Sequence, residues 1–297
     1  MPSSNTFEIT DVVAVSLALM RSNSVLGECV MRDAEAAFTG GRGDVVRVRT
    51  PKRRVAQNFN GTTVYTKVEE GHVQVKLTDE PTVAAAFTTK DMTLNIESFG
   101  EQVLKPQMDA VSAYVEKSAA AALLNAASKA TGARAIKADA KHGEAGHVVK
   151  MLTAAAADFT RREIPAAARF LAIGPDVQNI LLDVEQLQKV NEAGDSQALR
   201  NATMGELFGF RVVVSPYLDG AVAFHKTAYA LAVRAPSEVQ GGARSVSAAD
   251  NQYALRVTMD FDPSVKSEVS IVDTLRGVAT IDPARAIAFT VTPPAKA

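Results

Sequence analysis

The chain has 297 residues, of which 47% are hydrophobic and 22% charged, and its formal net charge at pH 7 is −1. These values are typical of a soluble globular protein with one large or two small domains, and they give no global support for binding to nucleic acid or to a membrane surface. Cys29 is the only cysteine, residues 1–8 lack a signal-peptide pattern, and no apolar run approaches the roughly 20 residues that span a bilayer. We therefore expect an intracellular protein without internal disulfides.

The N-terminal region is expected to be an arm followed by a turn. Apolar residues crowd together from Ile9 to Met31, which predicts a helix capped by Asp11 and a weaker helical patch at residues 25–31. The glycine-rich stretch 38–44 then breaks regular structure. Its triplet Arg42-Gly43-Asp44 is interpreted as a turn before a strand, because no Lys-Ser/Thr pair and helix follow to make a phosphate-binding loop.

A long two-stranded ribbon is predicted for residues 45–77. Val46, Val48 and Thr50 alternate with other residues on the outgoing arm, and valines recur on the return arm. Between the arms lies Asn60-Gly61, a strong hairpin dipeptide. Residues 42–54 hold six basic side chains against one aspartate, a local charge of +5, whereas the return arm is more acidic.

The charges of this ribbon have two interpretations, a solvated strand face or a contact between subunits. An isolated two-stranded ribbon is only marginally stable in water, so a long one makes better sense lying on another surface. The candidate contact residues are Arg47, Arg49, Lys52, Arg53, Arg54, Phe59, Glu69 and Glu70.

After a further strand at 83–89, a helix of about 25 residues is predicted from Lys105 to about Ala130. Pro106 suits a first helical position, and apolar residues recur at steps of three and four. At about 1.5 Å per residue this helix spans roughly 37 Å, so we expect it to be the spine of the fold. The predicted apolar stripe comprises Met108, Val111, Val115, Ala119, Ala122, Leu123 and Ala126, with Asp109, Glu116 and Lys117 largely off it.

The second half of the chain is expected to be a mixed layer. Predicted helices cover 148–162 and 177–184, and predicted strands cover 170–173, 210–214, 251–261, 265–275 and 277–281. A hairpin is expected at 221–232, with His225 at its turn. The stretches 132–146 and 236–250 are expected to be loops, and the tail from Thr292 is expected to be loose.

No constellation of residues that carries chemistry is recognisable, so no catalytic residue, metal site or cofactor is predicted. The loop residues His142 and His147 match neither zinc-finger nor His-Glu-x-x-His spacing. His225 has no Asp, Ser or Cys partner near it in the sequence. Two alternatives stay open, a small α/β enzyme that uses one of these histidines and a nucleic-acid binder that uses the basic ribbon. The absence of tryptophan and an aromatic share of 6% argue against base stacking.

Four stretches in this order resemble a tailed-phage major capsid protein of the Hong Kong 97 (HK97) fold, nearest to the branch that contains the coat protein of short-tailed Salmonella phages. They are residues 43–51 (GDVVRVRTP), 96–106 (IESFGEQVLKP), 205–215 (GELFGFRVVVS) with 223–228 (AFHKTA), and 273–283 (DTLRGVATIDP). The likeness runs from about Asp11 to Ile287. It implies an α+β fold with an N-terminal arm, an extended β-hairpin loop, a peripheral domain with a spine helix, and an axial domain.

The resemblance also implies a domain division and a set of partners. The N-terminal arm would be 1–44, the extended loop with its return strand 45–90, the peripheral domain 91–165, the axial domain 166–236, and the returning peripheral strands with the tail 237–297. The chain would assemble with itself, as hexamers and pentamers, into the head shell of a virion. Other expected partners are a scaffolding protein, a portal protein, a decoration protein and double-stranded DNA held without sequence specificity. No membrane contact is expected.

Two departures from the Salmonella-phage branch qualify the resemblance. No stretch is long enough for the domain inserted in the axial region of that branch, and no long helical extension precedes Asp11 to act as a fused scaffold. Scaffolding is therefore expected from a separate chain. A shell protein of an encapsulin-like nanocompartment, which has the same fold, remains an alternative.

Overall fold

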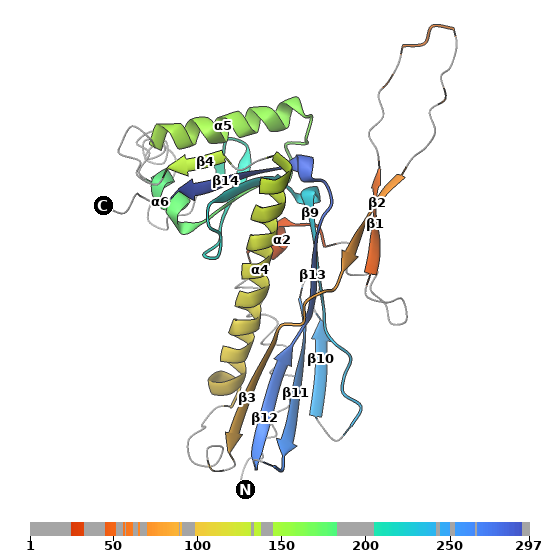
Figure 1. Cartoon of the computed structure of the whole chain (residues 1–297), viewed down its shortest axis with the longest axis vertical. Helices are drawn as coiled ribbons and strands as arrows, with labels where there is room; N and C mark the ends of the chain where they lie inside the picture. The colour runs from red at the N-terminus through yellow and green to blue at the C-terminus, as the bar shows by residue number, and fades with distance from the viewer. Residues whose placement is uncertain are drawn as a thin grey trace.

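A long helix joins the two halves of the protein, and a two-stranded ribbon projects from the side of the body (Figure 1). The computed structural model describes residues 25–32, 45–51, 56, 58–61, 65, 70–88, 90, 99–131, 134–137, 145–182, 205–241, 244–249, 253–264 and 266–292. The helix predicted at 9–20, the loop that holds His142 and the C-terminal tail lie outside these ranges. The mixed helices and sheets confirm the predicted α+β class.

The long helix α4 (Lys105–Thr131) confirms the predicted spine and its bounds. A π-helical turn, η2 (Gly100–Leu104), leads into it. Its buried residues belong to two hydrophobic clusters, one that includes Met108 and Val111 and another that includes Val115, Ala120 and Ala127. The prediction that Glu116 lies off the buried stripe is wrong, because this side chain is 1% exposed. A helix that packs against two halves of a protein has no wide polar face, so periodicity underestimates its burial.

The lower half of the molecule is an antiparallel sheet that packs on the N-terminal half of α4. Its order is β10-β11-β12-β3, formed by β10 (Arg244–Ala249), β11 (Ala254–Asp262), β12 (Ser267–Asp273) and β3 (Thr82–Thr88). Gln107 on α4 fixes the contact, because its amide nitrogen donates to Ser270 O at 2.9 Å and its amide oxygen accepts from Ser270 Oγ at 2.9 Å. The prediction of a loop at 236–250 is wrong for 244–249, since this short polar segment pairs as the sheet edge along β11.

The upper half is a six-stranded mixed sheet of order β4-β14-β8-β5-β7-β6. The strands are β4 (Arg134–Lys137), β14 (Ala286–Thr292), β8 (Ala221–His225), β5 (Arg169–Ile173), β7 (Phe210–Val214) and β6 (Glu206–Leu207). The prediction of a loop at 132–146 is wrong for β4, which pairs in parallel with β14. β14 itself was not expected from the sequence.

Both faces of this sheet are covered, which explains why β5 and β8 are buried along their whole length and mostly apolar. Alternate residues such as Leu171, Ala223 and Phe289 pack with α5 (Ala145–Arg161) and α6 (Pro175–Leu182). The residues between them, such as Val222 and Phe224, pack with the C-terminal half of α4. Many contacts on the α4 side are made by alanines, and these small residues allow a close approach of helix and sheet. They are Ala120, Ala127, Ala172, Ala228, Ala286 and Ala288.

A third small sheet, β9 (Tyr229–Arg234) paired with β13 (Leu275–Thr280), connects the two halves. The prediction of a hairpin at 221–232 is wrong, because β8 and β9 belong to different sheets. The short 3-10 turn η3 (Lys226–Ala228) redirects the chain from one sheet to the other. Another such turn, η4 (Pro283–Arg285), precedes β14. Met31, just after the one-turn helix α2 (Leu26–Cys29), adds a bridge at the edge of β9.

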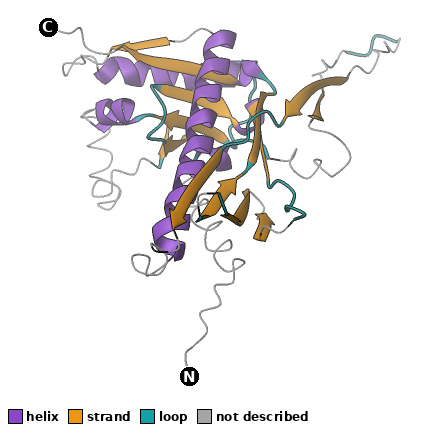
Figure 2. Cartoon of the chain, turned by 60° about the horizontal axis from the view of Figure 1, so that its bottom comes forward, coloured by secondary structure: helices purple, strands orange, loops and turns teal. Residues whose placement is uncertain are grey.

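The ribbon consists of β1 (Val45–Pro51) and β2 (Glu70–Lys76), paired antiparallel as predicted. In the turned view of Figure 2 it points away from α5 and α6. None of the described helices is long and apolar enough to cross a membrane.

Candidate functional site

The ribbon presents one basic face and one apolar face. Its register pairs Arg47 with Gln74 and Arg49 with His72, and these four side chains are exposed. On the opposite face Val46 pairs with Val75. The two residues of each pair, from Val45 and Lys76 to Pro51 and Glu70, lie equally far along the chain from the midpoint between residues 60 and 61. A ladder continued in that register would close between residues 60 and 61, so the pairing agrees with a tip at Asn60-Gly61, where Gly61 has a φ of +87°.

Four of the eight predicted contact residues lie within the described part of the ribbon. Arg47, Arg49 and Glu70 are exposed, and Phe59 at the tip is 70% exposed. Arg49 Nη1 lies 3.7 Å from Glu70 Oε2 across the strands. An exposed pair of this kind contributes little to stability, so these charges are available to another surface. Lys52, Arg53, Arg54 and Glu69 lie outside the described residues.

The base of the ribbon rests on the β9–β13 sheet through a small apolar cluster. Val75 is fully buried between the ribbon and the alanines Ala230 and Ala232 of β9. Val46 and Val48 from β1 and Ala279 from β13 complete the contact. Because these side chains are short and apolar, the contact is close but does little to fix the direction of the ribbon relative to the body.

The direction of the ribbon is restrained where the chain after β2 crosses β13. The crossing residues are Asp79, three residues after β2, and Arg276 in β13. The two residues form an antiparallel bridge in which Arg276 N donates to Asp79 O at 2.8 Å and Asp79 N donates to Arg276 O at 3.1 Å. Thr78 N also donates to Arg276 O, at 3.0 Å. The side chains close the same crossing, because Arg276 Nη1 lies 2.7 Å from Asp79 Oδ2.

Gly277 allows the ribbon to approach β13 this closely. A Cβ atom at this position would lie 2.0 Å from the carbonyl oxygen of Lys76 and 3.2 Å from Leu77 Cα. Both are backbone atoms, so a larger residue could be accommodated only if the strand or the ribbon moved.

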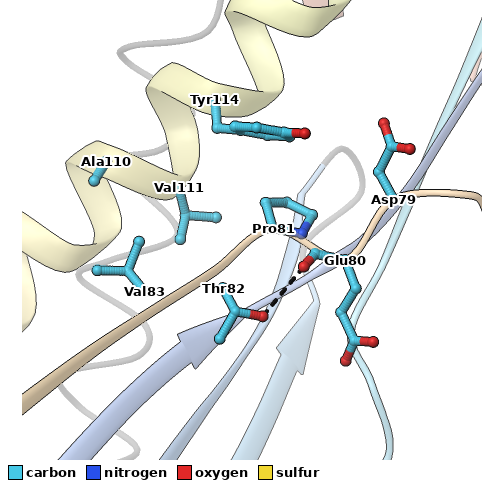
Figure 3. Close-up of a pocket in the computed structure, with 8 residues that line it drawn as sticks. All are labelled: Asp79, Glu80, Pro81, Thr82, Val83, Ala110, Val111 and Tyr114. Atoms are coloured by element: carbon cyan, nitrogen blue, oxygen red, sulfur yellow. Dashed lines mark hydrogen bonds between the residues drawn. The ribbon is translucent and has the colours of Figure 1, made fainter.

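A shallow pocket of about 370 Å³ opens beside this crossing, between the start of β3 and the side of α4 that carries Ala110, Val111 and Tyr114. Figure 3 shows Tyr114 from α4 lying over Pro81, with Asp79 and Glu80 at the rim. Thr82 Oγ1 donates to Glu80 O at 3.2 Å and fixes the bend of the chain there. Asp79 is therefore accessible to water on one side, and its side chain is 38% exposed.

Glu116 in the middle of α4 holds three parts of the chain together. Its Oε1 accepts a hydrogen bond from Leu26 N, at the start of α2, at 3.0 Å. The same oxygen accepts from Ser215 Oγ, directly after β7, at 3.3 Å. Buried carboxyl groups are costly unless hydrogen-bonded, and the two bonds that this one accepts join the N-terminal segment and the upper sheet to the spine.

Cys29 on α2 lies near Glu116, so the reactivity of its thiol indicates whether α2 is packed against this residue. Burial raises the pKa of its thiol to about 12, and the nearby carboxylates of Glu116 and Glu28 act in the same direction while Arg211 opposes them. At pH 8 the thiol is then almost entirely protonated, and the thiolate is the reactive form. We expect Cys29 to resist a disulfide-exchange reagent in the folded protein and to react within seconds after denaturation. Rapid reaction of the native protein would show that α2 is not seated on Glu116.

His225, which the enzyme alternative would use as a catalytic residue, makes hydrogen bonds that stabilise a turn. It is 7% exposed, its Nδ1 accepts from Thr227 N at 3.3 Å, and it lies 2.9 Å from Thr227 Oγ1. Burial and the neighbouring cations Arg285 and Arg169 lower the pKa of this imidazole. It therefore caps the η3 turn. Within the described ranges no three His, Cys, Asp or Glu side chains are grouped to hold a metal ion.

Sequence reasoning did not single out Arg276, Asp79 or Glu116. A signal for Arg276 existed, since it lies inside the run Leu275–Thr280, where the other positions are small or apolar. Asp79 and Glu116 gave no comparable signal, because a carboxylate in a connecting segment or on a helix is normally solvated.

The comparisons with known proteins agree with this architecture. A family model described as a phage capsid protein matches residues 90–278, which is 189 of the 297 residues. A structure from Mycobacterium phage Che8 is 17% identical with a TM-score of 0.65, and the match covers 90% of each chain. The capsid of cyanophage P-SCSP1u is 13% identical with a TM-score of 0.59 and 84% coverage of each chain. The mature capsid of bacteriophage PhiM1 is 13% identical with a TM-score of 0.57, covering 92% of this chain and 86% of that one.

At these identities the structural likeness establishes the fold, which is the HK97-like fold of phage capsids. The comparison with curated proteins gives no match. The family match identifies the chain itself: it belongs to the phage capsid protein family. It is a structural protein of the virion, a major capsid protein of which many copies build the shell.

Proposed function

We propose that the ribbon is the principal contact between neighbouring copies in this shell, with Arg47, Arg49, Lys52, Arg53, Arg54, Phe59, Glu69 and Glu70 as contact residues. The observation that carries the proposal is the exposed basic face of β1 and β2 on a projection that points away from its own body (Figure 1). A two-stranded ribbon has little stability of its own, and a neighbouring surface would supply the missing burial. Oppositely charged rims would then set the register between copies.

We further propose that the copies form hexamers and pentamers of an icosahedral head that encloses the double-stranded DNA of a tailed phage or prophage. The division into arm (1–44), extended loop (45–90), peripheral domain (91–165 and 237–297) and axial domain (166–236) is part of the same proposal. The location of β14 in the six-stranded sheet supports a refinement in which residues 286–292 return to the axial domain. The resemblance to the Salmonella-phage branch, without its inserted domain, supports a separate scaffolding chain, a portal protein and assembly in the bacterial cytoplasm.

Assembly tests the ribbon contact directly. Sedimentation velocity and negative-stain microscopy of the wild-type protein, with and without the product of its neighbouring gene, should show closed shells or ring-shaped capsomers. The double variant Arg47→Glu/Arg49→Glu should lower the yield of shells at least tenfold, because it reverses four units of charge on the ribbon. Its melting temperature should stay within about 2 °C of the wild type, since both side chains are exposed.

The matched control is Lys129→Glu/Lys150→Glu, which makes the same change in charge at exposed positions of α4 and α5. Shells of normal yield from the ribbon variant, or equal loss from the control, would contradict a specific contact of the ribbon. DNA inside native particles would support a phage head, whereas an enclosed enzyme would favour the nanocompartment.

A further inference from the structure

One residue pair, Asp79 and Arg276, joins the connection after the ribbon to β13 by both backbone and side-chain bonds. The apolar cluster at the ribbon base holds valines and alanines together with Met31, Leu77 and Ile281, and apolar contacts of this kind are not directional. The described hydrogen bonds that join the connection after β2 to β13 converge on Asp79 and Arg276, together with Thr78 N. A backbone bridge of a single residue pair can pivot, and the added ion pair restrains that pivot.

The burial of Arg276 shows that the pair is poorly arranged for stability alone. Its side chain is 4% exposed and makes one hydrogen bond, from Nη1, to Asp79. Its Nε is buried and has no hydrogen-bond partner among the described residues. Burial lowers the pKa of this guanidinium, against the opposing effects of Asp79 and Tyr114. A buried ion pair with incomplete hydrogen bonding contributes little net stability, and specifying one arrangement is the best-attested reason to keep it.

A second buried pair in the same protein shows the contrast. Arg256 Nε donates to Asp273 Oδ1 at 3.0 Å, its Nη2 donates to Asp273 Oδ2, and its Nη1 donates to Ser237 O at 2.7 Å. This two-pronged pair lies across β11 and β12, where Arg256 is paired with Asp273, and Asp273 is only 3% exposed. It is arranged as a pair that stabilises a sheet, whereas the Arg276 pair is arranged as a restraint.

Because the ribbon is long, a small rotation at its base displaces its tip by a large distance. The 15 residues from 61 to 75 can span at most about 50 Å. A rotation of about 10° at the base would displace a tip at that distance by roughly 9 Å, which is more than the roughly 4.8 Å between two paired strands. A contact made by the tip therefore requires the base to be fixed.

We propose that Arg276 is a positioning residue that restrains the direction of the ribbon relative to the body through Asp79, so that the ribbon reaches its neighbour within a narrow range of angles. This inference rests on the proposed role of the ribbon as the contact between copies. Arg276 does not itself touch the neighbour, because it is buried in the body. Its effect on assembly is transmitted by the crossing at the ribbon base.

The test compares Arg276→Met with Arg256→Met by amide hydrogen exchange, thermal unfolding and cryo-electron microscopy of the shells. Methionine keeps the apolar stem of Arg276, and the half-exposed Asp79 can turn to water. We expect Arg276→Met to keep its melting temperature within about 3 °C of the wild type, while exchange in residues 70–79 becomes at least tenfold faster and particle diameters become heterogeneous. Arg256→Met should show the opposite pattern, with a lower melting temperature, unchanged exchange in 70–79 and uniform particles.

Two further variants keep the test decisive. Arg276→Lys retains the positive charge and should restore most of the wild-type exchange and diameter. If Arg276→Met does not fold, Asp79→Asn removes the same ion pair and should loosen the same segment. Wild-type exchange in 70–79 for both Arg276→Met and Asp79→Asn, or equally heterogeneous shells from Arg256→Met, would overturn the proposal. A wild-type protein that forms no shells would refute the assembly role of the ribbon, and the exchange data would still decide whether Arg276 restrains it.

Discussion

The variant Glu116→Ala is expected to lower the free energy of unfolding by about 3–5 kcal/mol, because it removes the acceptor from two buried donors. Leu26 N and Ser215 Oγ both donate to Glu116 Oε1, and the side chain is 1% exposed. The N-terminal segment should detach before the rest of the protein unfolds, since α2 is a single turn with no capping side chain of its own. Urea unfolding measures the total loss, and the reactivity of Cys29 measures the detachment.

Two controls separate the buried carboxylate from the helix that carries it. Lys117→Ala changes the next residue of α4, which is exposed, and should alter stability by less than about 0.5 kcal/mol. Glu116→Gln keeps the acceptor oxygen and should lose less than half as much as Glu116→Ala. If Cys29 in Glu116→Ala stayed as unreactive as in the wild type, Glu116 would not be what seats α2.

The variant Gly277→Ala should be the most damaging single-methyl addition at the ribbon base. The new Cβ would lie 2.0 Å from Lys76 O and 2.7 Å from Lys76 C, and neither atom belongs to a flexible side chain. Relief requires β13 and the exit of the ribbon to separate, which would break the hydrogen bonds between Arg276 and Asp79. We expect a loss of about 3 kcal/mol or more in the free energy of unfolding and a failure to form regular shells.

Gly205→Ala is the matched control, because a Cβ there meets no atom within 4 Å. It should change stability by less than about 0.5 kcal/mol and leave assembly intact. A Gly277→Ala protein as stable as Gly205→Ala would mean that the ribbon does not pack on β13 as closely as the structure shows. Stable subunits that fail to assemble would instead locate the effect in the direction of the ribbon.

The elements with strong local patterns could be predicted from the sequence, and those that depend on partners could not. The helix from Lys105 has a clear apolar periodicity, and the two paired strands β1 and β2 are linked by a segment with the turn dipeptide Asn60-Gly61. These local patterns are enough to predict a helix and an antiparallel pair of strands. β4 and β10 are short segments that become strands only because β14 and β11 offer them an edge. The change of sheet between β8 and β9 is not visible in the sequence, because a turn at His225 between two apolar runs equally predicts a hairpin.

The candidate site divides in the same way. The alternation of Arg47 and Arg49 with valines predicted an exposed basic face, because alternation is a local property of a strand. Asp79 and Arg276 are 197 positions apart, so their pairing depends on how the whole chain folds. A single buried arginine in a strand gives a warning of such a partner but does not identify it.

The alanine contacts between α4 and the six-stranded sheet have a geometric consequence for the particle as a whole. Ala120 and Ala127 face Ala286 and Ala288 with almost no exposed surface, so the separation of helix and sheet is set by methyl groups. A larger residue would tilt the helix by a small angle that a lone subunit could tolerate. In a closed shell the same tilt would occur in every subunit, and together these tilts would change the curvature of the shell. We therefore expect larger residues at these buried alanines to change the radius of the shell, although none of these side chains lies at its surface.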